Sequence, residues 1–341
     1  MVEPVLITGA AGFIGFHTTK RLLERGLSVV GIDNMDDYYD VELKKNRLAE
    51  LQKYPSFTFR IISIQDRQEV SKIFSDFSFQ EVIHLAGRAG IRAPPSAAPK
   101  YVDSNLVGFC NIIDLCSTNE VQHFVYASSS SVYGTEAIAP FSTSQSVDHP
   151  QSLYAATKRA NELLAHAYSH NYSLPTTGLR FFTVYGPWGR PDMAVYKFTK
   201  KISRGEEIVV YGRGEVKRDF TYVDDVVEAI IGILSLPPRP VHDRLLTPAV
   251  SKAPYQIFNV GNGEPVTVNG LVANIELALN AKAKIRYEPT PSTDLNITHA
   301  HTEDLESALG FASSTDLEEG IRRFVTWFQS YYEDPKRINS K

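Results

Sequence analysis

The sequence predicts an α/β protein built on a doubly wound parallel sheet, followed by a smaller C-terminal α/β region. Two observations lead to this expectation. Short β-branched, apolar runs alternate with longer helical patterns over the first half of the chain, and a glycine-rich turn joins the first apolar run to the first helical pattern. After about residue 182 the alternation loosens. We therefore expect a first domain at 1–182 and a second at 183–341, with some of the chain crossing back to the first.

The elements of the first domain follow from their apolar patterns. The expected strands span 4–8, 28–33, 57–62, 81–86, 123–128 and 176–181. The expected helices span 13–25, 66–75, 102–117 and 153–170. Asp66, with Glu69 three residues later, has the outline of a capping box at one helix start. Nearly continuous apolar strands predict helices on both faces of the sheet, and ligands bind such sheets at the carboxyl ends of the strands.

The second domain shows fewer and shorter signals. Its expected strands lie at 207–212 and 218–223, and its expected helices lie near 194–204 and 224–235. The proline-rich stretch 236–254 is typical of a long surface excursion. A last amphipathic helix is expected at the sequence LEEGIRRFVTWFQSYY.

Composition excludes several classes of function. The chain has 341 residues and 35 Lys and Arg against 39 Asp and Glu, a net charge of −4, which does not favour nucleic-acid binding. No run approaches the ~20 apolar residues that cross a membrane, and the N-terminus has no signal-like pattern. Cys110 and Cys116, six apart in one expected helix, point in different directions, so we expect buried thiols and a cytoplasmic protein. The histidines show no ligand spacing, and we expect no metal site.

The glycine-rich turn is the first functional signal. Gly9, Gly12 and Gly15 lie between an apolar strand and a helix, and an acid, Asp33, ends the second strand. Glycines allow the backbone to approach a pyrophosphate, and the helix N-terminus offers free N–H groups. This is the Rossmann arrangement. Asp33 suits a ribose 2′-hydroxyl and repels a 2′-phosphate, and the two residues after it offer no cation, which favours NAD over NADP.

The second signal is a tyrosine and a lysine on one helix. Tyr154 and Lys158 are four residues apart, so they share a face about 6 Å apart along the axis. A lysine ammonium stabilises the phenolate and lowers the pKa of the tyrosine. The phenolate can then remove a sugar-hydroxyl proton while NAD accepts the hydride. Ser129, in the run ASSSSVYG at the end of an expected strand, precedes this pair.

Taken together, these residues resemble the extended short-chain dehydrogenase/reductases that act on nucleotide sugars. The resemblance covers roughly residues 4–310 and rests on the motifs TGAAGFIG, HLAG, SSSSVYG, YAATK, RFFTVYGP, RDFTYVDD and FNVGNG. Within that family the chain is most similar to UDP-glucuronate 4-epimerases. The narrowing features are the tyrosine-rich acidic stretch at 33–48 and the sequence RFFTVYGPWGRPDMA at 180–194.

The resemblance implies an NAD-dependent 4-epimerisation of UDP-glucuronate to UDP-galacturonate. Tyr154 would take the proton of the C4 hydroxyl, Ser129 would hydrogen-bond the reacting oxygen, and Lys158 would hold the nicotinamide ribose and tune Tyr154. C4 would be oxidised to a ketone, the keto-sugar would turn over, and the hydride would return to the other face. The implied cofactor contacts are Gly9, Gly12, Phe13, Ile14, Gly15, Asp33, Asn34, Asp66, Leu85, Ala86 and Lys158.

The resemblance also implies a UDP-sugar site. The expected substrate contacts are Ser130, Ser131, Thr183, Arg190, Val209, Tyr211, Arg218 and Asp294. Of these, the arginines suit the pyrophosphate, the strand at 209–212 suits uracil, and the hydroxyls of Ser130, Ser131 and Thr183 suit the sugar carboxylate. The chain departs from the family pattern in four places: Ser63 stands where an aspartate reads adenine, Gly87 replaces an alanine, and Pro291 and His301 occupy usual UDP-binding positions.

The residues named so far leave alternative functions to be distinguished and the oligomeric state to be predicted. The alternatives are a UDP-glucose/UDP-galactose 4-epimerase, a 4,6-dehydratase, a UDP-glucuronate decarboxylase and, in a different class, a non-catalytic NAD-responsive binding protein. Dehydratases place Asp-Glu, and decarboxylases a glutamate, where this chain has Ser130 and Ser131. Relatives dimerise through the helices expected here at 102–117 and 153–170, and we expect a homodimer. The apolar residues that are either core or interface are Leu106, Phe109, Ile113, Leu163, Leu164 and Tyr168.

Overall fold

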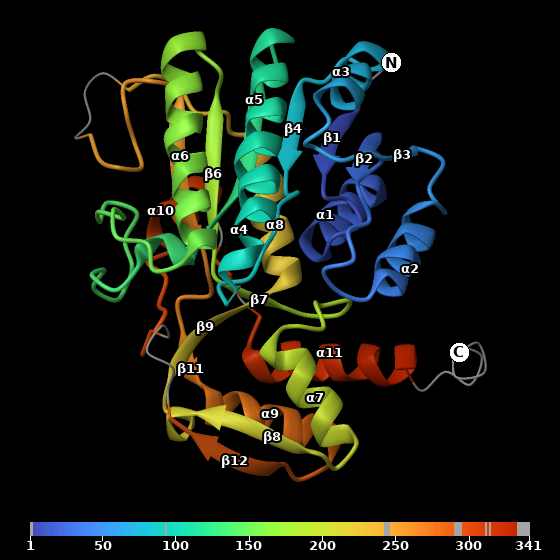
Figure 1. Cartoon of the computed structure of the whole chain (residues 1–341), viewed down its shortest axis with the longest axis vertical. Helices are drawn as coiled ribbons and strands as arrows, with labels where there is room; N and C mark the ends of the chain where they lie inside the picture. The colour runs from blue at the N-terminus through green and yellow to red at the C-terminus, as the bar shows by residue number, and fades with distance from the viewer. Residues whose placement is uncertain are drawn as a thin grey trace.

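The computed structural model describes residues 3–92, 94–241, 246–289, 295–310, 312–313 and 315–332. Its main feature is a seven-stranded sheet, in the upper part of Figure 1, whose strands are all parallel and follow the order β10-β6-β5-β4-β1-β2-β3. The strands are β1 (Val5–Thr8), β2 (Val29–Asp33), β3 (Phe57–Ile61), β4 (Glu81–His84), β5 (His123–Ser129), β6 (Thr176–Phe181) and β10 (Tyr255–Val260). The predicted fold class, a doubly wound parallel sheet, is confirmed.

Helices cover both faces of this sheet and enclose two apolar cores. One core joins α1 (Phe13–Glu24) and α8 (Val223–Leu234) to the sheet. The other joins α3 (Arg67–Asp76), α5 (Gly108–Thr118) and α6 (Leu153–Tyr172) to the opposite face. The helix predicted at 102–117 is longer than expected. It starts at α4 (Ala98–Val102) and passes through a π-helical turn (Asp103–Val107) into α5.

A second, smaller layer lies below the sheet in Figure 1. It contains the pair β8 (Glu207–Tyr211) and β12 (Lys284–Glu288), and the helices α7 (Ala194–Ser203), α9 (Val268–Leu279) and α11 (Leu317–Tyr332). A three-stranded sheet of β11 (Pro265–Thr267), β9 (Lys217–Tyr222) and β7 (Thr183–Tyr185) accompanies them. This layer has an apolar core of its own, which includes Tyr196, Ile208, Ile275 and Phe324.

Three segments from the second half of the chain return to the larger layer. β10 pairs in parallel with β6, α8 packs against α1, and α10 (Glu303–Leu309) packs against α8 and β10. Crossing back of this kind was expected. The division of the chain at residue 182 remains a prediction, because these segments tie the two parts of the chain together.

Helix α2 (Val41–Leu51) was not predicted from the sequence. It begins within the acidic, tyrosine-rich stretch, where Asp40 caps it by accepting a hydrogen bond from the backbone N–H of Glu42 at 3.0 Å. Leu43 and Leu51 anchor the helix because both side chains are completely buried. The stretch therefore contains a loop at 34–40 followed by a helix, and this helix brings two basic side chains to the functional site.

Other local predictions can be compared directly with the structure. The capping role of Asp66 is confirmed: its carboxylate accepts hydrogen bonds from the N–H groups of Gln68 and Glu69, each at 3.1 Å. Cys110 and Cys116 are both free thiols, and Cys116 is buried as predicted, but Cys110 is only half-buried. In the part of the chain that the structure describes, no helix is long and apolar enough to span a bilayer. No group of three or more potential metal ligands occurs among those residues.

Candidate functional site

The glycine turn between β1 and α1 requires glycine for two reasons. Gly9 has a positive φ of 75°, and a Cβ atom there would lie 2.8 Å from the backbone nitrogen of Ala86. A Cβ atom at Gly15 would lie 2.0 Å from the carbonyl oxygen of Gly9. The turn therefore packs directly against the end of β4, where the predicted residues Leu85 and Ala86 lie. No side chain caps α1 at Gly12, so the turn leaves its first N–H groups to a ligand.

The remaining residues predicted for the cofactor surround this turn at different depths. Phe13 opens α1 with a buried ring against His17, while Ile14 is half-buried. The side-chain oxygen of Asn34 accepts a hydrogen bond from the N–H of Asp36, and the exposed carboxylate of Asp66 caps α3. Ser63, in the position of the family's adenine-reading aspartate, donates a hydrogen bond to Gln65. The structure thus gives Asn34, Asp66 and Ser63 local roles in loops and caps.

Asp33 is buried and has a basic neighbour. Its carboxylate accepts hydrogen bonds from the N–H groups of Ala11 at 3.2 Å and Met35 at 2.8 Å. The Nζ atom of Lys44, on α2, lies 3.5 Å from its Oδ1 atom. The two residues that follow Asp33 offer no cation, as expected from the sequence. The cation comes from further along the chain, because α2 folds back and places Lys44 beside the carboxylate.

Arg47, one turn after Lys44, joins three loops of the site. Its guanidinium is completely buried and donates hydrogen bonds to the carbonyl of Ala11 at 2.9 Å, the hydroxyl of Tyr39 at 2.7 Å and the carbonyl of Trp188 at 2.5 Å. The glycine turn, the loop at 34–40 and the loop that follows β7 therefore meet on one side chain. Sequence reasoning missed it because the helical pattern of VELKKNRLAEL was not recognised within the acidic stretch.

The predicted trio of Ser129, Tyr154 and Lys158 comes together at the carboxyl end of β5. Ser129 ends the strand and caps the short 3₁₀ turn Ser130–Tyr133, where its hydroxyl accepts a hydrogen bond from the N–H of Ser131 at 3.2 Å. Tyr154 and Lys158 lie in the first two turns of α6. The side chain of Ser129 lies near enough to Tyr154 to lower the pKa of its hydroxyl. The Nζ atom of Lys158 donates to the carbonyl of Ala127, also on β5, at 2.9 Å.

The electrostatics of the pair differ from the expectation. Burial raises the pKa of Tyr154, and the nearby Ser129 side chain and the charge of Arg190 only partly oppose this effect. Burial also lowers the pKa of Lys158 to about 8, which still leaves the ammonium mostly protonated at neutral pH. The prediction that the pKa of Tyr154 is lowered is therefore wrong for this structure. Burial dominates, and the Lys158 ammonium is directed to Ala127.

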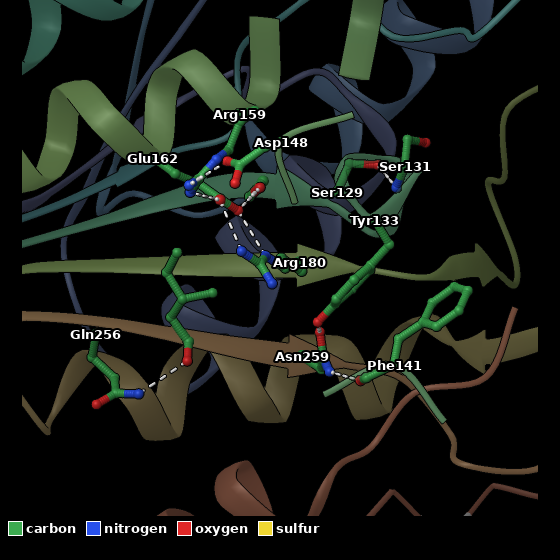
Figure 2. A network of polar contacts seen from close by, with 12 residues as sticks. Ser129, Ser131, Tyr133, Phe141, Asp148, Arg159, Glu162, Arg180, Gln256 and Asn259 are labelled. Carbon is green, nitrogen blue, oxygen red and sulfur yellow. Dashed lines mark hydrogen bonds and ion pairs between the residues drawn. The ribbon is translucent and has the colours of Figure 1, made fainter. Parts of the chain in front are cut away.

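A buried polar network behind the trio fixes β5 to α6 (Figure 2). The Ser128 hydroxyl donates to Glu162 at 2.6 Å, and Arg180 on β6 donates two bonds to the same carboxylate, at 2.8 and 2.9 Å. Arg159 adds a third basic contact at 3.1 Å. Burial raises the pKa of the Glu162 carboxyl, but Arg180, together with the Ser128 hydrogen bond and the charge of Arg159, lowers it, and the net pKa is lowered. Ser128 therefore links β5 to Glu162 on α6.

This network extends toward the second half of the chain. The guanidinium of Arg180 lies 4.8 Å from the ring centre of Tyr133, whose hydroxyl donates to Asn259 on β10 at 2.7 Å. Asn259 in turn donates to the carbonyl of Phe141 at 2.6 Å (Figure 2). The turn that holds Ser130 and Ser131 is thus held in place from behind. Sequence reasoning missed Glu162, although it lies four residues after Lys158 and continues the face of Tyr154 and Lys158.

A pocket lies between β7, α7 and β9, and the charge of one of its residues, Arg190, lowers the pKa of Tyr154. Its empty volume is about 310 Å³, part of it open to solvent, and its lining includes the predicted substrate residues Thr183 and Arg190. The apolar part of the lining includes Met193, Tyr196 and Phe220. Arg190 is itself paired with Asp192, with 2.5 Å between its Nη2 atom and a carboxylate oxygen. The pocket thus combines an apolar wall, a hydroxyl and an arginine.

The other predicted substrate residues lie outside the lining of this pocket. Val209 and Tyr211 are on β8, where the guanidinium of Arg92 lies 5.5 Å from the ring centre of Tyr211. Arg218 is on β9 and donates a hydrogen bond to the carbonyl of Lys217. The carbonyl of His301 accepts a hydrogen bond from Asn259 at 3.1 Å. Asp294 and Pro291 are outside the described residues.

The loop at 34–40 lies over the site rather than on a remote surface. The guanidinium of Arg88 lies 4.9 Å from the ring centre of Tyr38, and the guanidinium of Arg190 lies 5.7 Å from the same ring centre. Arg88 also approaches Asp36, with 3.6 Å between Nη1 and Oδ1. The charge of Tyr38 is among the causes that raise the pKa of Tyr154, so the loop is electrostatically close to the trio. The acidic, tyrosine-rich stretch therefore borders the site through Arg88 and Arg190.

Several known proteins similar to this chain are named as UDP-glucuronate or UDP-glucuronic acid 4-epimerases. A probable UDP-glucuronate 4-epimerase of Rhizobium meliloti (strain 1021) is 43% identical, with 96% of this chain and 97% of the relative covered. UDP-glucuronate 4-epimerase 4 of Arabidopsis thaliana is 44% identical over 99% of this chain and 78% of its own length. Among solved structures, the UDP-glucuronic acid 4-epimerase of Bacillus cereus, in complex with UDP-glucuronic acid and NAD, superposes with a TM-score of 0.84 at 28% identity, with 96% of this chain and 100% of that chain covered.

The family assignment follows from a match over most of the sequence. The model of the NAD dependent epimerase/dehydratase family matches residues 5–261, which contain the glycine turn, the trio and the network behind it. The seven-stranded sheet and the position of the trio at its carboxyl edge agree with that match. The chain therefore belongs to the NAD dependent epimerase/dehydratase family.

Proposed function

We propose that this protein is an NAD-dependent UDP-glucuronate 4-epimerase that interconverts UDP-glucuronate and UDP-galacturonate. The observation that carries the proposal is the meeting of Ser129, Tyr154 and Lys158 beside a glycine turn and an arginine-containing pocket. The identity of 43% to the Rhizobium relative over nearly the whole chain supports the substrate.

The residues present fit NAD. Gly9 and Gly15 lie so close to neighbouring backbone that neither position has room for a side chain. The first N–H groups of α1 have no side-chain cap and suit a pyrophosphate. Asp33 suits the adenosine ribose, and Lys158 suits the nicotinamide ribose. When bound, NAD serves as the acceptor and then the donor of the C4 hydride. Asn34, Asp66, Leu85 and Ala86 complete the proposed cofactor contacts.

The protein's own groups manage the proton and the sugar. Tyr154 takes the proton of the C4 hydroxyl, and Ser129 hydrogen-bonds the same oxygen. Because burial favours the neutral phenol, the proton transfer depends on Ser129 and on the charge of Arg190, both of which lower the pKa of Tyr154, to stabilise the phenolate. Arg190 and Arg218 are the proposed contacts of the pyrophosphate, Val209 and Tyr211 of uracil, and Asp294 of the UDP end.

Incubation of the purified protein with UDP-glucuronate, followed by proton NMR of the sugar, tests the proposed function. The expected product is UDP-galacturonate, and the reverse reaction from UDP-galacturonate is expected as well. UDP-glucose in a parallel incubation is expected to turn over more slowly. Preferred turnover of UDP-glucose, release of a pentose nucleotide as the main product, or no turnover of any UDP-sugar would each replace the proposal with one of the alternatives.

The substrate carboxylate is proposed to lie between Ser130, Ser131 and Thr183. A dehydratase-type Asp-Glu in place of the two serines would repel it, whereas hydroxyls donate to it. Each hydrogen bond to a charged group contributes ~1.5–3 kcal/mol, enough to favour an acid sugar over UDP-glucose. The same bonds have a second consequence. Once C4 is a ketone, the sugar is a β-keto acid that loses carbon dioxide when its carboxylate stands perpendicular to the carbonyl plane, and fixed donors suppress this loss.

Thr183→Ala, alone or with Ser130→Ala, is expected to weaken the binding of UDP-glucuronate and to increase the release of a decarboxylated UDP-4-keto-pentose. Mass spectrometry of the products and titration with UDP-glucuronate measure both effects. Ser78→Ala, at an exposed serine just before the amino end of β4, is the control. Normal affinity and no additional decarboxylation would mean that these hydroxyls do not hold the carboxylate. Its partner would then be sought among Arg88, Arg92 and Arg190.

A homodimer is proposed on the exposed apolar side chains of α4, the π-helical turn and α6. Phe109 and Ile113 belong to the core, whereas Val102, Val107, Leu153 and Leu163 are between 39% and 56% exposed. Apolar side chains on adjacent helices suit a helix bundle with a second copy. Sedimentation is expected to give the mass of two chains, and Leu163→Glu is expected to give one. A single-chain mass for the unaltered protein would refute the dimer.

The free thiols support the proposed cytoplasmic location.

A further inference from the structure

Lys44 and Asp33 form a buried pair of opposite charges at the edge of the proposed cofactor site. Their side chains are only 8% and 6% exposed, and Nζ of Lys44 lies 3.5 Å from Oδ1 of Asp33. The same carboxylate also holds the N–H of Ala11, which lies in the glycine turn. The pair therefore belongs to the wall of the site rather than to the outer surface of α2.

Lys44 differs from its basic neighbours on α2. Arg47 is committed to carbonyl and hydroxyl oxygens, and Lys45 is 60% exposed and paired with Glu42. Among the described residues, Asp33 is the acid that lies within ion-pair distance of Lys44. A buried ammonium without an anion is strongly unfavourable, so the loss of the Asp33 charge would leave Lys44 in need of a new anionic partner.

This arrangement bears on how the site distinguishes NAD from NADP. An acid at the end of the second strand rejects NADP by repelling the 2′-phosphate and by accepting a hydrogen bond from the 2′-hydroxyl of NAD. Lys44 opposes the repulsive part, because an ammonium beside the carboxylate attracts the same phosphate. The preference of the site for NAD over NADP then depends on two opposing effects on the 2′-phosphate: repulsion by Asp33 and attraction by Lys44, which lie side by side.

We propose that Lys44 is a specificity-determining residue that weakens the rejection of NADP and forms, beside Asp33, a latent site for the 2′-phosphate. Removing Lys44 strengthens the preference for NAD, and neutralising Asp33 exposes Lys44 and turns the preference toward NADP. The inference rests on the proposed function only in taking a nicotinamide dinucleotide as the cofactor. It does not depend on the sugar substrate.

The test measures bound nucleotide and no sugar turnover, so it separates this inference from the proposed epimerase activity. Holoprotein is incubated with equal concentrations of NAD and NADP until the bound fraction is constant, then desalted and denatured. The released nucleotides are quantified by chromatography. The variants are Lys44→Met, Asp33→Asn and the double variant, and Lys45→Met on the exposed side of the same helix is the matched control.

Lys44→Met is expected to raise the ratio of bound NAD to bound NADP by roughly tenfold, the size of effect that a close charge contact has on binding. Asp33→Asn is expected to lower the ratio below one, and the double variant to bring it near one. Lys45→Met is expected to leave it unchanged. A purely structural role for Lys44 would weaken both nucleotides alike, so an unchanged or lower ratio in folded Lys44→Met would overturn the proposal. If Asp33→Asn does not fold, the Lys44→Met result decides by itself.

Discussion

Replacing Tyr154 with phenylalanine is expected to lower the rate of epimerisation at least about 100-fold, the usual contribution of a positioned acid or base. The ring stays in the fold while the hydroxyl, which lies near Ser129, is lost. The proposed proton acceptor at the C4 hydroxyl is then absent, but the glycine turn and the pocket keep their residues. Conversion of UDP-glucuronate, followed by NMR, measures the loss.

The control for this variant lies on the same helix. Tyr172 is 63% exposed near the end of α6, and Tyr172→Phe is expected to leave the rate unchanged. Circular dichroism and the amount of bound NAD should be the same for both variants and the unaltered protein. A Tyr154→Phe rate within about tenfold of wild type, a barrier change of only ~1.4 kcal/mol, would mean that another group acts as the base.

Replacing Glu162 with glutamine is expected to lower the free energy of unfolding by about 3–5 kcal/mol, the usual cost of removing one partner of a buried ion pair. Arg180 would keep a buried charge without its carboxylate, since the side chains of both residues are fully buried. The Ser128 hydroxyl would also lose its anionic acceptor. Urea denaturation at neutral pH measures the change. Glu50→Gln, in the exposed pair with Lys53, is the control and is expected to have little effect.

The same pair predicts a pH dependence. Because the pKa of Glu162 is lowered in the folded protein, its contribution to stability is fully present above the ordinary carboxyl pKa and is lost as the pH falls through the lower folded value. The difference in stability between the unaltered protein and Glu162→Gln is therefore expected to narrow in acid. A difference that stays constant down to the acid transition would show that the charge of Glu162 does not stabilise the fold.

The larger sheet could be predicted from the sequence because its signals are local. A buried parallel strand has to be apolar along its whole length, and the turn between β1 and α1 has to contain glycine where a Cβ atom would meet backbone. The spacing of Tyr154 and Lys158 likewise fixes a common face before any tertiary contact forms. For these features, the physical constraint acts between neighbours in the chain and can therefore be recognised in the residue pattern itself.

Other parts of the fold had no such local signal. β10 is separated in the chain from its partner β6 by β7, α7, β8, β9 and α8. A six-residue strand at 255–260 is also as apolar as a helix segment of that length. The start of α2 is acidic and rich in tyrosine, which is equally typical of a loop. Only the packing of Leu43 and Leu51 against the rest of the protein decides for a helix.

The sequence by itself therefore determined the class of fold, the glycine turn and the identity of the proposed trio. The tertiary structure alone decided their electrostatic surroundings: Lys44 beside Asp33, Arg47 between three loops, Glu162 against Arg180, and a pKa of Tyr154 that is raised instead of lowered. The physical reason is that periodicity and turn geometry act between neighbours in the chain. Burial and charge pairing depend on distances in space that exist only after distant segments have packed together.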